Sequence, residues 1–160
     1  MTMLIQRVNI LCSTVLHISI DRLNYIIANI EKFYIEYQKP KRDKTGAKRL
    51  NKPQYQERYG KYWSRTINPP HEELKNIQKC INGYLVNHIP MPDFAYGGVE
   101  KKDNILNAKQ HKGRKYVFQT DLTDFYPFIS CKRVYEMFVR VGFSADVASK
   151  LTKLTTFKGH

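Results

Sequence analysis

The chain has 160 residues, of which 42% are hydrophobic and 12% aromatic, so it can fold as one domain or as part of a larger one. That apolar content excludes a chain that is disordered throughout. Lys and Arg (27) outnumber Asp and Glu (14), and the formal net charge of +13 favours a polyanionic partner, most commonly nucleic acid, over a membrane surface.

Cysteine usage and hydrophobic patterning exclude several other classes of protein. Cys12, Cys80 and Cys131 are odd in number and far apart, so the sequence predicts neither a disulfide framework nor a zinc knuckle, and a reducing cytoplasm is the expected location. No apolar run is long enough to cross a bilayer. An N-terminal extension, residues 1–20, is apolar in part, but it contains His17 and no convincing cleavage site, which argues against a signal peptide.

Two helices are predicted in the first half of the chain. Residues 21–37 have apolar side chains at helical spacing, and Asp21 is placed to cap the N-terminus, so this stripe is expected to pack in the core. The second helix is predicted from Asn68 as a cap, prolines in the first turn and acids at the positive end of the helix dipole. It should end before Pro90, and a connector should follow over residues 90–106.

Between these helices lies the most basic part of the chain. Residues 39–65 carry ten Lys and Arg side chains against Asp43 and Glu57, a net charge of +8 out of the total of +13. Proline and glycine at 40, 46, 53 and 60 should break any helix, so we predict a β-hairpin with a long, mobile tip. The interleaved aromatic residues are Tyr55, Tyr59, Tyr62 and Trp63. Charge runs are usually solvated loops, but this combination favours contact with nucleic acid or nucleotides.

The cations of the hairpin form two candidate groups. Lys41 and Arg65 lie on the two arms, where a lysine as a point charge and an arginine as a bidentate donor would meet a triphosphate, although plain surface cations are the simpler interpretation. The candidates for contact with a nucleic-acid backbone are Lys39, Arg42, Lys44, Lys48, Arg49, Lys52, Arg58 and Lys61.

The last part of the chain predicts a strand followed by two helices. Residues 116–122 have the composition of a buried strand, which would deliver Asp121 near its end. Ser130 is placed to cap a helix that closes at Gly142, and Ser144 to cap the next one. Helices, a hairpin and a central strand together predict an α+β fold.

Asp121 is the candidate catalytic residue. Nucleotide polymerisation requires two divalent metals about 3.5–4 Å apart, held by carboxylates on a rigid sheet. Asp121 and the backbone carbonyl of Leu122 would supply oxygen ligands suited to Mg²⁺. The backbone amides of Asp124, Phe125 and Tyr126 would point at phosphate oxygens, and the Tyr126 ring under the sugar would exclude a 2′-hydroxyl. The competing interpretation is that Asp121 is only a turn residue and Tyr126 a core aromatic.

Six short segments occur in an order and at a spacing that together are specific. They are Lys-Pro-Lys at 39–41, Arg-Thr-Ile-Asn-Pro-Pro at 65–70, Leu-Lys-Asn-Ile-Gln at 74–78, Ala-Tyr-Gly-Gly at 95–98, Asn-Ala-Lys-Gln-His at 107–111 and Asp-Leu-Thr-Asp-Phe-Tyr-Pro-Phe-Ile at 121–129. Over about residues 30–160 this series resembles the retron-like and group-II-intron-like bacterial reverse transcriptases.

The resemblance implies an RNA-directed DNA polymerase with a right-hand architecture. Residues 21–115 would form the fingers and the entry to the palm, and residues 116–160 the start of the palm. The complete enzyme would extend a DNA or RNA primer on an RNA template with dNTPs and two Mg²⁺ ions, for which Mn²⁺ is an alternative. Asp121 would match the first metal-binding aspartate of the family, and Tyr126 its sugar-selecting aromatic.

The same resemblance makes Lys41 and Arg65 the triphosphate contacts at the fingertips. The hairpin carries an unusually long basic insertion, residues 43–61, so Lys39 is an alternative to Lys41 in that role. Tyr126 stands where phenylalanine is commoner in the family, which should preserve the selection of the sugar.

Two further expectations come from the family pattern. The family continues with an Asp-Asp hairpin that this sequence does not contain, so the isolated chain is expected to lack polymerase activity and to need a C-terminal polymerase portion. The open edge of an incomplete palm sheet should also promote self-association. Asn107 and His111 match a family signature, for which structural hydrogen bonding is the expected role.

Two other functions are compatible with the sequence. The first is a non-catalytic nucleic-acid-binding module, in which Asp121 is structural. The second is a fragment of a group II intron maturase, whose partner would be intron RNA and whose activity would be splicing.

Overall fold

The computed structural model describes the backbone of residues 4–122 and 125–159. Its elements in chain order are α1 (Val8–Ile10), the π-helix η1 (Leu11–Leu16), α2 (Ile20–Ala28), the 3-10 helix η2 (Ile30–Phe33), β1 (Tyr37–Pro40), α3 (Pro53–Tyr59), β2 (Ser64–Ile67), α4 (Glu72–His88), α5 (Asn104–Gln110), the 3-10 helix η3 (Tyr126–Phe128), α6 (Cys131–Val141) and α7 (Ala145–Thr155). Helices together with one small antiparallel sheet are compatible with the predicted α+β class.

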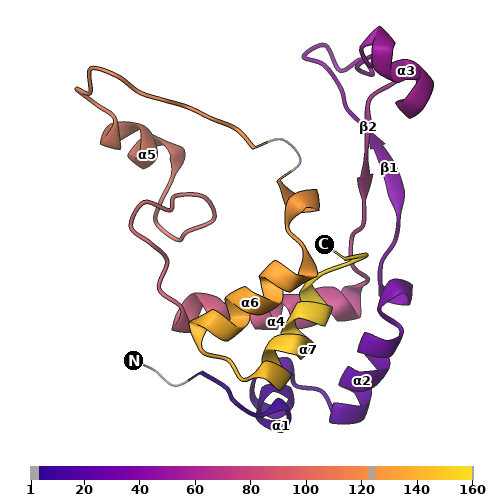
Figure 1. Ribbon diagram of the computed structural model, residues 1–160, viewed down its shortest axis with the longest axis vertical. Helices are drawn as coiled ribbons and strands as arrows, with labels where there is room; N and C mark the ends of the chain where they lie inside the picture. Colours follow the sequence, from indigo (N-terminus) through magenta and orange to yellow (C-terminus); the bar gives the residue numbers. More distant parts are fainter. Residues whose placement is uncertain (1–3, 123–124, 160) are drawn as a thin grey trace.

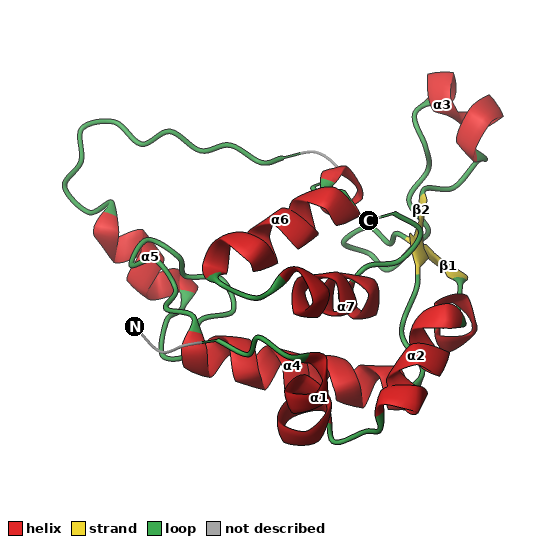
Figure 2. Ribbon diagram, turned by 60° about the horizontal axis from the view of Figure 1, so that its bottom comes forward, coloured by secondary structure: helices red, strands yellow, loops and turns green. Residues whose placement is uncertain are grey.

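The helices α1, α2, α4, α6 and α7 gather at one end of the molecule, and the β1–β2 hairpin extends from them with α3 at its far end (Figure 1). A second arm, formed by the connector around α5 and the chain that follows it, extends separately from the same helices (Figure 2). The C-terminal segment ends near the base of the hairpin.

The core lies where α2, α4, α6 and α7 meet around the N-terminal helices. Leu23 and Ile26 of α2, Leu74 of α4, and Val147 and Leu154 of α7 are all 0% exposed. Burial of a side chain of this size stabilises the fold by roughly 1.5–3 kcal/mol relative to exposure. Leu23 and Ile26, in the first part of the apolar stripe predicted over residues 21–37, are therefore core, as expected.

The apolar N-terminal segment also packs into this core. Leu11 and Leu16 of η1 are 1% and 3% exposed. Among the described residues no single helix is long and apolar enough to cross a bilayer; Val8–Leu16 and Ile20–Ala28 pass that test only as a pair, bent by 94°.

Three helices begin at a serine. Ser130 and Ser144 each accept a hydrogen bond from the backbone amide three residues later, which confirms two predicted caps. Ser19 does the same for α2, so the predicted cap, Asp21, lies inside the first turn instead. Gly142, with φ of +112°, ends α6 in the left-handed conformation, as predicted.

The first predicted helix is shorter than its apolar pattern indicates. α2 ends at Ala28, and Tyr37 already belongs to β1. The chain leaves the helix because Tyr34 pairs with Pro70 and the Ile35 amide donates to the Pro69 carbonyl at 3.0 Å. Periodicity could not reveal this, since the partner segment lies more than thirty residues further along the chain.

The same pairing places the start of α4 later in the chain than predicted. The helix begins at Glu72, with His71 rather than Asn68 at its cap position, because the two prolines between them continue the extended backbone. Its last residue is His88, before Pro90 as predicted.

The predicted hairpin is confirmed, with Lys39 opposite Arg65 in the antiparallel register. The prediction that no helix forms in its tip is wrong, because α3 occupies Pro53–Tyr59. Pro53 lies in the first turn, where backbone N–H groups have no helical partner, and Gly60 ends the helix with φ of +82°. These two residues therefore delimit a helix instead of preventing one. The mobility of the tip stays a prediction.

The buried strand predicted at 116–122 is not formed. The segment has no regular secondary structure, and Tyr116, Phe118 and Leu122 are 82%, 90% and 63% exposed. A strand needs a partner for its backbone N–H and C=O groups, and the strands found in the described residues, β1 and β2, pair with each other. The assignment of this segment to a palm stays a prediction.

Candidate functional site

Lys41 and Arg65, the predicted triphosphate contacts, converge on one aromatic ring. The Lys41 Nζ lies 4.4 Å from the centroid of the Trp63 ring, and the Arg65 Cζ lies 5.4 Å from the same centroid. Alternate residues of a strand face the same side, so Lys39, which is paired with Arg65, adds a third cation to this face. The sequence marked Trp63 only as one of four interleaved aromatics, because a cation–π contact across two strands leaves no local signal.

Three backbone segments lock together beside this ring. The Lys41 amide donates to the Trp63 carbonyl at 2.8 Å, the Arg49 amide to the Lys41 carbonyl at 2.8 Å, and the Trp63 amide to the Arg49 carbonyl at 2.9 Å. This closed cycle holds Arg49, which belongs to the long insertion, against both arms. The insertion therefore holds the backbone of a further basic residue, Arg49, against the two arms.

A compact turn at 43–47 begins the insertion. Asp43 Oδ1 accepts from the Thr45 hydroxyl at 2.6 Å, the Thr45 amide at 2.8 Å and the Ala47 amide at 3.1 Å. The Thr45 hydroxyl, followed by these amides, holds the pKa of the Asp43 carboxyl below its usual value. Arg42 donates to the Gly46 carbonyl at 2.6 Å and so joins the same turn.

The far end of the insertion is closed by Asn51, which is only 6% exposed. Its amide donates to the Lys61 carbonyl at 3.0 Å, and its side chain donates to the Gly60 carbonyl at 2.6 Å. Gln56 of α3 donates back to the Asn51 carbonyl at 2.8 Å. The tip is thus a small closed unit, which composition alone did not indicate.

The predicted nucleic-acid contacts remain open to solvent. Among the described side chains the exposed ones are Lys39, Arg42, Lys44, Lys48, Arg49, Lys52 and Lys61. Arg58 lies in α3, but its side chain is outside the described part of the structure. The ion pairs between described side chains all lie outside the hairpin, so none neutralises these cations.

The base of the hairpin is anchored to the core by Gln78 of α4. Its side-chain amide donates to the Tyr34 hydroxyl at 3.0 Å and to the Leu154 carbonyl at 2.8 Å. The Tyr34 ring also contacts the Phe157 ring, with centroids 4.3 Å apart, and burial raises the pKa of Tyr34. Gln78 closes the Leu-Lys-Asn-Ile-Gln segment, so this motif residue positions the hairpin.

The described residues of the predicted catalytic segment lie on the part of the second arm that follows α5 in Figures 1 and 2. Asp121 and Leu122 lie on its exposed, irregular part, whereas Asp124 is outside the described residues. Phe125 and Tyr126 follow at η3, 48% and 80% exposed, with ring centroids 5.4 Å apart. The structure therefore does not bring this segment onto the hairpin cations.

A two-metal centre does not fit the described residues by themselves. No group of three His, Cys, Asp or Glu side chains gathers among them in a way that could hold a metal ion. Asp121 offers one carboxylate, and two metals a few ångströms apart require several. No metal-dependent step follows from this arrangement.

Within the described part of the chain, Asn107 and His111 do not make the structural hydrogen bonds expected of them. Both lie at α5, which Asp103 caps by accepting from the Leu106 amide at 2.7 Å. Their side chains are exposed and make no hydrogen bond to another described residue. The family signature at these positions thus has no packing explanation in this structure.

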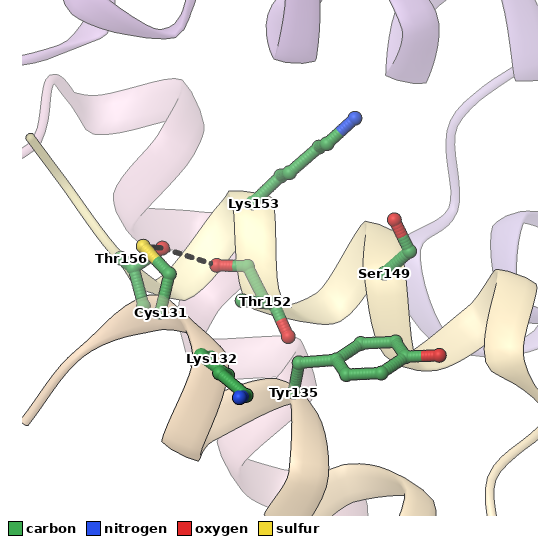
Figure 3. Close-up of a pocket in the computed structure, with 7 residues that line it drawn as sticks. All are labelled: Cys131, Lys132, Tyr135, Ser149, Thr152, Lys153 and Thr156. Carbon is green, nitrogen blue, oxygen red and sulfur yellow. Dashed lines mark hydrogen bonds between the residues drawn. The ribbon is translucent and has the colours of Figure 1, made fainter. Parts of the chain in front are cut away.

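A shallow cleft of about 370 Å³ lies between α6 and α7 (Figure 3). Its lining residues are Cys131, Lys132, Tyr135, Ser149, Thr152, Lys153 and Thr156. The Cys131 thiol donates to the Thr156 hydroxyl at 3.2 Å, which is a packing contact between the two helices. None of the sequence-predicted site residues lines this cleft, so the hairpin remains the candidate site.

Comparisons with known proteins show where this chain has relatives. No family model matches it. It is 33% identical over 145 residues to the Retron Se72 reverse transcriptase of Salmonella heidelberg (strain 579083-10). The matched region covers 90% of this chain and 34% of that protein. It is also 33% identical over 95 residues to the Retron Ec86 reverse transcriptase of Escherichia coli (59% of this chain, 29% of that protein) and 32% identical over 92 residues to the Retron Mx65 reverse transcriptase of Myxococcus xanthus (58% and 22%). The chain thus spans about a third or less of the length of these relatives.

Proposed function

Since the homologues of this chain are retron reverse transcriptases, we propose that the chain is part of an RNA-directed DNA polymerase of the retron type. In this proposal the β1–β2 hairpin belongs to the fingers and contacts the incoming dNTP and the nucleic acid. The arm that carries Asp121 contributes to the catalytic centre, and the RNA template and its primer lie between the two.

The observation that carries the proposal is the convergence of Lys41 and Arg65 on Trp63. Two cations held at one ring repel each other, and a polyphosphate bound between them would relieve that repulsion. The arginine can make paired hydrogen bonds to phosphate oxygens, and the lysine adds a point charge. Lys39 on the same face adds further attraction for a triphosphate.

We further propose that Asp121 and the Leu122 carbonyl contribute to a Mg²⁺ site of the complete polymerase, with Mn²⁺ as an alternative. The other carboxylates of such a site would come from residues other than those described. Phe125 and Tyr126, both exposed, would lie against the nucleotide sugar, and Tyr126 would reject a 2′-hydroxyl. Asp124 is proposed to support the triphosphate through its backbone amide.

Primer extension tests this proposal. The protein to use is the longest one that contains this chain in frame, with an RNA template, a labelled primer and dNTPs. Replacing Asp121 by Asn should lower extension by roughly 10³-fold or more, because catalytic groups that act as a unit fail together. RNA binding should remain, since the charge of the hairpin is unchanged.

A matched control for this experiment is Asp146→Asn, because Asp146 is exposed in the first turn of α7. This variant should extend primers as the unmodified protein does. Equal activity of both variants would contradict a catalytic role for Asp121.

A non-catalytic nucleic-acid-binding module is the second candidate. It is favoured by the unneutralised cations of the hairpin and by the isolated position of Asp121 among the described residues. Under this alternative the chain still binds RNA. Primer extension, however, is absent from every protein that contains this chain within a longer sequence. The maturase alternative stays a prediction.

A further inference from the structure

Two lysines lie close to the Tyr62 ring at the tip of the hairpin. The Tyr62 side chain is 42% exposed, and the Nζ atoms of Lys48 and Lys61 lie 5.6 and 5.8 Å from its ring centroid. Across the hairpin it pairs with Leu50, which is 56% exposed. An apolar ring and an apolar neighbour are thus presented to solvent within the most basic part of the chain.

The backbone on both sides of Tyr62 is held in place. The Trp63 amide donates to the Arg49 carbonyl at 2.9 Å, and the Lys61 carbonyl accepts from Asn51 at 3.0 Å. Successive residues of an extended arm point to opposite sides, so Tyr62 faces away from the Trp63 ring that Lys41 and Arg65 share. The Tyr62 surface is therefore separate from the proposed triphosphate contact.

An aromatic ring on a fixed backbone with two cations beside it matches the chemistry of an unpaired polynucleotide. A base in a single strand offers a free face that can stack on a tyrosine ring, and its two neighbouring phosphates lie within reach of the flanking lysines. Bases within a duplex are stacked on each other and offer no such face. The net charge of +8 on residues 39–65 attracts either form, but only the ring distinguishes them.

We propose that Tyr62 is a base-stacking platform, and that Lys48 and Lys61 hold the phosphates on either side of the stacked base. The hairpin tip would then prefer an unpaired strand to a duplex. This inference rests on the proposed function, because it takes the hairpin to be a nucleic-acid interface. It gives one of the four interleaved aromatic residues a specific role, and it adds the strandedness of the ligand.

Fluorescence anisotropy on the 160-residue chain tests the inference. The probes are a labelled RNA strand of mixed sequence, the same strand annealed to its complement, and the equivalent DNA strand. Tyr62→Ala should weaken binding of the single strands by roughly 5- to 100-fold and change duplex binding by less than about 2-fold, because only stacking is lost. Tyr62→Phe keeps the ring and should bind as the unmodified chain does.

Tyr25→Ala is the matched control, because Tyr25 of α2 is 50% exposed with the Arg22 guanidinium 5.0 Å from its ring centroid. It has a similar exposure and a stacked cation but lies away from the hairpin, so its replacement should leave both binding curves unchanged. An equal loss in Tyr25→Ala and Tyr62→Ala would overturn the inference.

The charge variant Lys48→Gln with Lys61→Gln separates the two proposals. It should weaken single-strand and duplex binding alike. On a single strand, the slope of log K against log salt concentration should become shallower by about 0.7 for each lost phosphate contact. Unchanged binding in this variant would remove the hairpin tip as the interface, and the stacking platform with it, whereas the proposed function is decided separately by primer extension with Asp121→Asn. Weaker binding here, combined with no selective loss in Tyr62→Ala, would overturn the stacking platform alone.

Photocrosslinking of the unmodified chain to 5-iodouridine RNA gives a result that does not depend on how any variant folds. A crosslink to Tyr62, in the tryptic peptide 62–65, would support the platform. Fragmentation of this peptide distinguishes Tyr62 from Trp63, and crosslinks that avoid Tyr62 altogether would count against it.

Discussion

Asp43 is one of two acidic residues in the basic hairpin, and its carboxylate closes the turn at 43–47 instead of neutralising a lysine. The Thr45 hydroxyl and two backbone amides donate to the same oxygen, Asp43 Oδ1. Trp63 orders basic side chains without neutralising them, because its ring contacts both Lys41 and Arg65. At the scale of single residues the hairpin is therefore shaped by contacts that leave its cations available.

The turn at Asp43 should respond to acid. Its folded pKa is lowered, so its contribution is fully present above the ordinary value of 3.8 and is lost as the pH falls through the folded pKa below it. We expect the amide protection of Thr45 and Ala47 to disappear over that range, as measured by hydrogen exchange in NMR. Asp43→Asn should abolish this pH dependence, and a pKa of Asp43 at or above 3.8 would contradict the prediction.

At the scale of elements, α4 connects the hairpin to the helical core. Gln78 reaches Tyr34 before β1 and Leu154 in α7, so one side chain joins three segments that are far apart in sequence. Near it, Lys158 pairs with Glu36 at 2.6 Å, and the Cys131 amide donates to the Gly159 carbonyl at 3.0 Å. The orientation of the hairpin is therefore set at its base.

Removing the Gln78 side chain should destabilise the protein. Gln78→Ala deletes two hydrogen bonds and leaves the partly buried Tyr34 hydroxyl and Leu154 carbonyl without these partners, at a cost of about 1–3 kcal/mol. Urea denaturation measures the change in the free energy of unfolding. The neighbouring exposed residue provides the control, as Lys79→Ala should change stability by less than about 0.5 kcal/mol. Equal effects of the two substitutions would show that Gln78 does not anchor the hairpin.

At the scale of the whole molecule, one arm carries a concentration of exposed apolar side chains. Tyr116, Phe118, Tyr126 and Phe128 are each more than 70% exposed, and the described backbone at 116–122 has no strand partner. Exposed apolar side chains next to unpaired backbone groups favour association with another chain or another part of the same protein. This arm thus has the composition of a strand without the neighbours that would make it one.

The 160-residue chain should therefore self-associate as its concentration rises. Phe118→Ser should shift sedimentation-velocity profiles toward the monomer, because it removes the most exposed apolar side chain of the arm. Phe94→Ser is the matched control, since Phe94 is 84% exposed and belongs to the same arm but lies before α5, outside the unpaired segment 116–122. A chain that stays monomeric and melts cooperatively at every concentration would contradict the prediction.

The sequence by itself determined the features that depend on nearby residues and on composition. Serine caps at Ser130 and Ser144 and the end of α6 at Gly142 follow from local chemistry, and each was predicted correctly. The charge of residues 39–65 is a matter of composition alone. The ordered series of motifs likewise indicated the retron reverse transcriptases, to which the comparisons then found similarity.

Only the tertiary structure decided which distant residues meet. It placed Lys41 and Arg65 on one ring, made Gln78 an anchor and turned the insertion into a closed unit around Asn51. It also left residues 116–122 without a strand partner, contrary to their composition. The physical reason is that a cap or a turn is satisfied within a few residues, whereas strand pairing and cation–π contacts require partners that the fold must bring together.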